Sequence, residues 1–177
     1  HKEHINMNQI NIQYYKTKYA EFILGSFENK LCLLDFKYRK MRTTVDNRLK
    51  KGFEAEFIEQ DDEILKETRK QIDEYFNMER KEFDIPLITI GTDFQKSVWD
   101  ALLKVPYGAT STYLKLAKDI DNEKAVRAVA NANGANSIAI IIPCHRIIGT
   151  NGELTGFGGG LPLKKRLLKL EQNLFAV

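Results

Sequence analysis

The sequence has few of the features that mark membrane proteins, disulfide-rich domains or cysteine zinc sites. Only two of its 177 residues are cysteine, Cys32 and Cys144, too few for a disulfide framework or a zinc site built from cysteines. The longest apolar run, residues 138–142, is far shorter than the roughly 20 apolar residues of a membrane span. Residues 1–4 do not have the layout of a secretory signal. We therefore expect a cytoplasmic protein with free thiols.

Charge of either sign shows no large excess, since the net charge is +3. Residues 92–177 hold 11 Lys/Arg and 7 Asp/Glu (+4), whereas residues 1–91 hold 16 and 17 (−1). If the chain binds nucleic acid, its second half is the expected binding face. An ordinary solvated surface explains so small a difference equally well.

The hydrophobic pattern of residues 1–91 predicts a scaffold domain made of a β-sheet and a helix. Residues 9–38 alternate as in a hairpin or meander, and residues 61–78 have helical spacing. Residues 39–52 are basic and poor in apolar side chains, which indicates a loop or a marginal helix. Residues 83–90 predict a short strand, which Pro86 would confine to a sheet edge.

Residues 92–177 predict a second, mostly helical domain, so the fold class is α+β. A helix is expected after Thr92 or Asp93, and two shorter ones over 113–120 and 123–133. The tight turn between these two indicates a helix-turn-helix, although simple helix packing also explains the alanines of the second. A last helix should begin after Pro162. Its apolar positions are Leu163, Leu167, Leu170 and Leu174.

The apolar run 138–142 predicts a buried strand that ends beside Cys144. A lone cysteine is usually a small core residue, but the adjacent His145 is a base that can raise the thiolate fraction. Glu171 falls on the apolar face of the last helix, where a carboxylate needs a partner such as an imidazole. Cys144, His145 and Glu171 thus form a candidate nucleophile, base and orienting group. A partly exposed Glu171 is the alternative.

Residues 149–160 contain six glycines around Phe157, which indicates tight turns or close approach to a planar ligand. A mobile surface loop is the alternative. A phosphate-binding loop fits poorly because the Gly-Lys-Ser/Thr signature is missing.

The segment Ile-Pro-Cys-His-Arg-Ile-Ile at 142–148, followed by Gly-Phe-Gly-Gly-Gly at 156–160, resembles the methylated-DNA–protein-cysteine methyltransferases, the O6-alkylguanine-DNA alkyltransferases. The resemblance covers about residues 92–171. It implies that Cys144 accepts the alkyl group and that His145 acts as its base through a water. It also implies that Glu171 orients His145 and that Asn136 holds the turn before the active-site strand.

The resemblance implies binding of duplex DNA with an alkylated guanine through the minor groove. The displacement itself needs no metal or cofactor, and a monomer is the default expectation, with the oligomeric state open. Tyr113 would help to rotate the damaged nucleotide outward, and Arg127 would fill the gap that it leaves. The groove-facing surface would include Ala125, Ala128 and Asn131, and the substrate loop would be Phe157, Gly158 and Gly159. Because the thioether product is a poor leaving group, we expect one turnover per molecule.

The chain departs from the family pattern at several positions. Asn131 and Asn133 add polar bulk to the helix expected to face DNA. Ser137 stands where many relatives have proline, Phe157 where some have tyrosine, and Gly158 where some carry a side chain. The range of alkyl groups and activity on O4-alkylthymine are therefore open. The main alternative function is a helix-turn-helix DNA-binding protein with a structural or regulatory Cys144. A cysteine hydrolase that uses Cys144, His145 and Glu171 is a third and weaker hypothesis.

Overall fold

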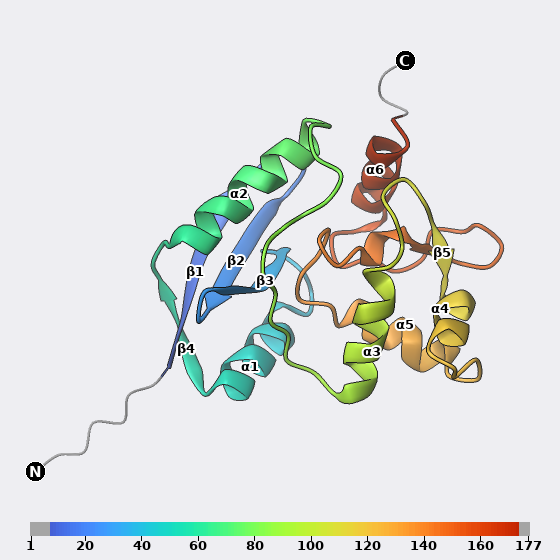
Figure 1. Ribbon diagram of the computed structural model, residues 1–177, viewed down its shortest axis with the longest axis horizontal. Helices are drawn as coiled ribbons and strands as arrows, with labels where there is room; N and C mark the ends of the chain where they lie inside the picture. Colours follow the sequence, from blue (N-terminus) through green and yellow to red (C-terminus); the bar gives the residue numbers. More distant parts are fainter. Residues whose placement is uncertain (1–7, 174–177) are drawn as a thin grey trace, which may run out of the picture.

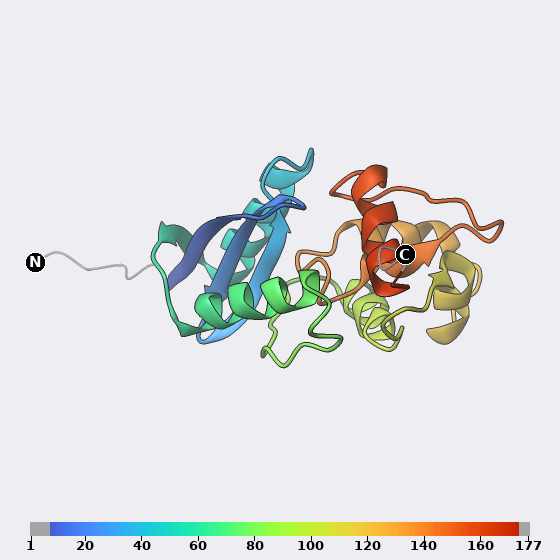
Figure 2. The ribbon, with the colours of Figure 1, turned by 90° about the horizontal axis from the view of Figure 1, so that it is seen from above.

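The structure is a computed structural model that describes residues 8–173. Leu174, expected on the last helix, lies outside this range. A β-sheet domain comes first and a helical domain follows, side by side along the long axis of the molecule (Figures 1 and 2). This is the α+β fold class expected from the sequence. No helix within residues 8–173 is long and apolar enough to cross a membrane.

A four-stranded sheet forms the first half of the chain. Its strands are β1 (Asn8–Lys16), β2 (Glu21–Phe27), β3 (Lys30–Phe36) and β4 (Ala55–Glu59), in the order β3-β2-β1-β4. The first three are antiparallel neighbours, and β4 runs parallel to β1. The meander expected over 9–38 is present, whereas β4 was not predicted.

Two helices cover opposite faces of this sheet (Figure 2). Helix α1 (Arg42–Phe53) buries Val45 and Leu49 against one face. It is a full helix where the sequence indicated a loop or a marginal helix. Helix α2 (Glu63–Phe76) begins after Asp62, whose side chain accepts a hydrogen bond from the Leu65 N–H at 2.8 Å. The apolar face of α2 belongs to a core cluster that continues into the second half.

The strand expected over residues 83–90 does not form. The segment makes only an isolated bridge, Leu87 with Leu31. The Leu31 N–H donates to the Pro86 carbonyl at 2.8 Å, and the Ile88 N–H donates to the Leu31 carbonyl at 2.9 Å. Proline has no N–H to extend such a ladder, so the segment lies along β3 without becoming a strand.

Four helices form most of the second half. They are α3 (Asp93–Leu102), α4 (Tyr113–Asp119), α5 (Val126–Gly134) and α6 (Leu161–Glu171). Thr92 begins α3 in a reciprocal capping box with Gln95, and Thr112 caps α4. Helix α5 begins three residues later than predicted. A short parallel pair, β5 (Ser111–Thr112) with β6 (Ile147–Ile148), was not predicted.

The run 138–142 is buried as expected, but it is not a strand. Only Ile138 forms a bridge, with Leu34 of β3, and the next residues form turns in which Ile140 has φ of 70°. The Asn136 side chain bonds to backbone groups of this segment and replaces a ladder partner. Cys144 therefore begins a short 3-10 turn, η1 (Cys144–Arg146), and does not end a strand.

Candidate active site

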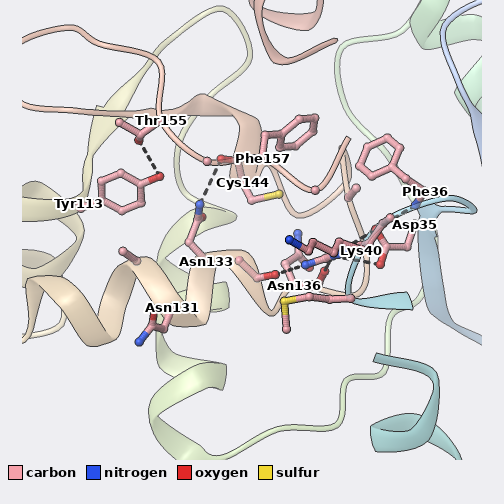
Figure 3. Close-up of a pocket in the computed structure, with 17 residues that line it drawn as sticks. Asp35, Phe36, Lys40, Tyr113, Asn131, Asn133, Asn136, Cys144, Thr155 and Phe157 are labelled. Atoms are coloured by element: carbon pink, nitrogen blue, oxygen red, sulfur yellow. Dashed lines mark hydrogen bonds and ion pairs between the residues drawn. The ribbon is translucent and has the colours of Figure 1, made fainter. Parts of the chain in front are cut away.

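A cavity of about 560 Å³ lies between the two halves of the molecule. Its walls come from the end of β3 and the segment that follows it (Asp35, Phe36, Arg39, Lys40 and Met41), from helix α5 and its following turn, and from the glycine-rich loop. Cys144 lies at the centre of the residues drawn, with Tyr113 on one side and Phe36 on the other (Figure 3). The volume falls in the usual range of small-molecule sites.

The thiol of Cys144 is buried, with 7% of the residue exposed. Burial raises its pKa, and a hydrogen bond from Asn136 and the charges of Arg39 and Lys164 offset this only in part. The sequence-based expectation that the neighbours of Cys144 increase its thiolate fraction is therefore wrong for the resting protein. The thiol is protonated near neutral pH and needs a base to react.

His145, the residue after Cys144, and Glu171 are both buried and in contact. His145 Nε2 is 2.6 Å from Glu171 Oε2. Its other ring nitrogen, Nδ1, is buried without a hydrogen-bond partner among the described residues. Since Glu171 fixes Nε2, Nδ1 is the nitrogen left to exchange a proton with the thiol.

Glu171 is also held by Arg146, a residue of the same 3-10 turn as Cys144. Arg146 Nε and Nη2 donate to Glu171 Oε1 and Oε2 at 2.7 and 3.1 Å. Burial alone would raise the pKa of Glu171, but the hydrogen bonds and charges of His145 and Arg146 prevail and lower it to about 2. Burial lowers the pKa of His145 more than Glu171 raises it. The site thus contains a neutral imidazole beside a carboxylate–guanidinium pair.

Asn136 shapes the turn that carries the thiol. Its amide Nδ2 donates to the carbonyls of Ile138 and Ile142 at 3.2 and 2.9 Å, and its Oδ1 accepts from the Ile138 N–H at 2.9 Å. The neighbouring Ser137 donates its hydroxyl to the Cys32 carbonyl in β3 at 3.0 Å. Ser137 therefore ties the turn to the sheet at the position where many relatives have proline.

The glycine-rich loop forms one wall of the cavity. Phe157 is half-buried, and its ring meets Phe36 edge-on at 5.3 Å. At Gly159 a Cβ would lie 2.8 Å from Leu163 and 2.9 Å from Phe36, so the loop passes too close for a side chain. The ammonium group of the buried Lys164 donates to the Thr155 carbonyl at 2.7 Å and fastens the start of the loop. Burial lowers the pKa of Lys164 to about 8.

The expected DNA-contacting residues occupy different positions relative to the cavity. Tyr113 and Asn131 line it, with the Tyr113 hydroxyl accepting a hydrogen bond from Thr155 at 3.1 Å. Arg127 and Ala128 are exposed on α5 outside the cavity, and Ala125 is half-buried before the first turn of that helix. Asn133, which the sequence suggested would face DNA, is instead buried and donates to the Cys144 carbonyl at 3.4 Å.

Sequence reasoning missed the residues that the first half contributes to the site. Arg39 pairs with the buried Asp35 at 3.0 Å and donates to the carbonyls of Gly134 and Asn136 at the end of α5. Tyr75 donates its hydroxyl to Glu171 at 2.6 Å. Apart from the local Arg39–Asp35 pair, these contacts join residues 95 or more positions apart, and no local pattern signals such pairs. Within residues 8–173, no group of three or more His, Cys, Asp and Glu could hold a metal ion.

Comparisons with known proteins agree over almost the whole chain. Residues 10–89 match the model of the 6-O-methylguanine DNA methyltransferase ribonuclease-like domain, and residues 93–173 match that of its DNA binding domain. A methylated-DNA–protein-cysteine methyltransferase of Methanosarcina barkeri is 45% identical over 85% of this chain and 90% of its own length. One of Methanosarcina acetivorans is 54% identical over 63% of this chain and 72% of its own length. The crystal structure of Mycobacterium tuberculosis OGT in complex with DNA superposes with a TM-score of 0.79 and 37% identity over 93% of each chain.

Proposed function

The chain belongs to the 6-O-methylguanine DNA methyltransferase family, and from this premise we propose that Cys144 is the residue that accepts the alkyl group. The family's reaction, repair of DNA by transfer of an alkyl group to a cysteine of the protein, is the activity of this chain. The observation that carries the assignment is that Cys144 lines the cavity and is followed directly by His145, whose ring pairs with Glu171 at 2.6 Å. The other cysteine, Cys32, is fully buried, and burial raises its pKa to about 12.

In the proposed reaction the thiol proton passes through a water molecule to Nδ1 of His145. The thiolate attacks the alkyl carbon on O6 of guanine. The sulfur–carbon bond forms as the carbon–oxygen bond breaks, and guanine leaves with the electron pair of that bond. The proton on His145 then neutralises the guanine anion by way of solvent. Glu171 orients the imidazole and stabilises its charged form while it holds the proton.

We propose that the damaged base leaves the duplex to enter the cavity. The O6 atom lies within the stacked helix, so the base must be flipped out at a cost of about a few kcal/mol. Tyr113, which lines the cavity, would crowd the 3′ phosphate of the rotating nucleotide, and the exposed Arg127 would fill the vacated stack. Phe157 would offer its ring to the base, while Gly158 and Gly159 let the loop approach closely.

Helices α4 and α5 are proposed to act as a helix-turn-helix whose second helix enters the minor groove. Ala125 and Ala128 permit close approach, and Asn131 adds a polar contact beside the cavity. In this proposal residues 92–177 form the DNA-binding and transfer domain, and residues 1–91 the scaffold. We further propose a cytoplasmic monomer that is consumed in one turnover. Activity on O4-alkylthymine stays a prediction to be tested.

The experiment follows the alkyl group itself. The protein is mixed with duplex DNA carrying O6-[methyl-³H]methylguanine, and the labelled peptide is identified by mass spectrometry. We expect one label per protein on the Cys144 peptide, none in Cys144→Ala despite retained DNA binding, and full labelling in the matched control Cys32→Ala. Label elsewhere, or repeated turnover, would contradict the assignment. A helix-turn-helix protein with a structural cysteine would bind the DNA and acquire no label.

A further inference from the structure

The carboxylate of Glu171 is held from the opposite half of the molecule as well as from its own. Tyr75, in the last turn of α2, donates its hydroxyl to Glu171 Oε2 at 2.6 Å, across 96 positions of sequence. This is the same oxygen that faces Nε2 of His145, also at 2.6 Å. The phenol and the imidazole therefore compete for one carboxylate oxygen.

We propose that Tyr75 is a positioning residue of the alkyl-transfer site, and that its phenol fixes Glu171 and sets how strongly that carboxylate supports His145. The inference rests on the proposed roles of His145 and Glu171. It assigns the sheet domain a direct part in the chemistry, because the phenol comes from α2.

The location of Glu171 explains why an additional donor matters. Glu171 is the last residue of α6, where the partial negative charge of the helix end disfavours a carboxylate. It is almost fully buried, so it depends on protein donors in place of water. Arg146 donates to Oε1 at 2.7 Å and to Oε2 at 3.1 Å, and the Gly108 N–H makes a longer 3.4 Å contact with Oε1. Tyr75 and His145 are the close donors to Oε2.

Tyr75 is rigidly placed for this task. It has no exposed surface, and its ring packs against Phe76, Phe83 and Tyr107 with centroids 5.5 to 6.2 Å away. Burial, together with the charge and hydrogen bond of Glu171, raises its pKa well above the ordinary value. The phenol therefore stays protonated and donates at every pH at which the protein works.

A donor on Oε2 withdraws negative charge from the oxygen that supports the imidazole. Loss of the phenol therefore makes the carboxylate more basic and raises the pKa of His145. The neutral imidazole is the base, so the acidic limb of the transfer rate moves to higher pH. Other charged or titratable groups around the pair are Arg146 and Tyr107 at Glu171, and Arg146 and Lys164 at His145. All of them remain in the variant.

The test compares the pH dependence of transfer in the full-length protein and in Tyr75→Phe. The probe is the free base O6-benzylguanine, which removes DNA binding from the measurement. In Tyr75→Phe we expect the midpoint of the acidic limb to move to higher pH by about half a unit to one unit, as for loss of one hydrogen bond to a charged group. The rate on the alkaline plateau should change less than about threefold, because Arg146 still holds Glu171.

Two matched variants separate this role from simple stabilisation. Tyr107→Phe removes a nearby phenol that does not bond to Glu171, and Tyr15→Phe removes a phenol that donates to Asp73 of α2 at 2.5 Å, away from the site. In both variants the acidic limb of the transfer rate should keep its wild-type midpoint, even if Tyr15→Phe lowers the melting temperature. An unshifted limb in Tyr75→Phe would overturn the proposal.

Should Tyr75→Phe fail to fold, 3-fluorotyrosine at position 75 retains the ring and the hydroxyl. Its more acidic phenol is a stronger donor, so the limb should move to lower pH, and no movement would overturn the proposal. The outcome is separable from that of the function. If the wild-type protein gains no label on Cys144, the proposed function is wrong. If the wild type is labelled but changes at Tyr75 leave the midpoint of the acidic limb unmoved, only this inference is refuted.

Discussion

Replacement of Glu171 by glutamine should remove a pH-dependent part of the protein's stability. The ordinary pKa of a glutamate is 4.5, and His145 and Arg146, against burial, lower that of Glu171 to about 2 in the folded protein. A folded pKa below the unfolded one stabilises the fold above about pH 4.5, and this contribution is lost as the pH falls toward 2. The difference, 4.5 minus about 2, corresponds to about 3 kcal/mol at about 1.4 kcal/mol per unit.

The assay is urea unfolding of wild type and Glu171→Gln at pH 7, 5, 4 and 3. The free energy of unfolding should differ by about 3 kcal/mol at pH 7 and 5, and by roughly half as much at pH 3. The variant leaves the Arg146 guanidinium buried without its anion, which independently predicts a loss of about 3 kcal/mol or more.

The matched control is Glu74→Gln, which breaks a more exposed pair, Glu74 with Arg80 at 2.9 Å. A surface pair contributes at most about 1 kcal/mol. If Glu171→Gln lost no more than the control, or if its deficit stayed constant down to pH 3, the charged arrangement described here would be wrong.

Three further outcomes are expected. The rate at which iodoacetamide modifies Cys144 should rise with pH, with a midpoint above the free-thiol pKa of about 8.5, because burial raises the pKa of Cys144. A midpoint below that value would refute a protonated resting thiol. Asn136→Ala should cost about 2 kcal/mol in urea unfolding, because buried backbone groups lose their partners, whereas the exposed Asn131→Ala should cost almost nothing. Arg48→Met removes the 2.8 Å hydrogen bond from Arg48 to the Ala135 carbonyl at the end of α5. The variant should transfer the alkyl group from duplex DNA several-fold more slowly but react with O6-benzylguanine at the wild-type rate. Equal slowing of both reactions would contradict a role of Arg48 in placing α5.

The sequence predicted elements whose signals are local. Thr92 and Thr112 are caps whose partners lie three residues away, and the meander of β1 to β3 follows from alternation and one tight turn. The burial of Glu171 followed from its place on the apolar face of α6. Lys164 lies on the same buried face of α6 and is fully buried, so the helical spacing indicates its burial as well.

The features that were missed depend on distant partners. The run 138–142 has the composition of a strand, but the side chain of Asn136 satisfies its backbone, and only Ile138 reaches β3. The apolar spacing of α2 marks Tyr75 as a core residue and does not show where its hydroxyl points. The thiol pKa of Cys144 depends on burial by the whole fold, which the adjacent histidine could not reveal.

The turn that precedes Cys144 also covers the outer side of β3. The Leu34 N–H donates to the Ser137 carbonyl at 2.9 Å, and the Ala139 N–H donates to the Leu34 carbonyl at 2.7 Å. During synthesis, Leu34 emerges about 100 residues before Ile138, its bridge partner, which is roughly 5–20 s at ordinary translation rates. Over that interval β3 presents unpaired backbone groups, a template for aggregation. The nascent chain is thus most vulnerable until its reactive segment has been made, and a fragment ending before that segment would be prone to self-association.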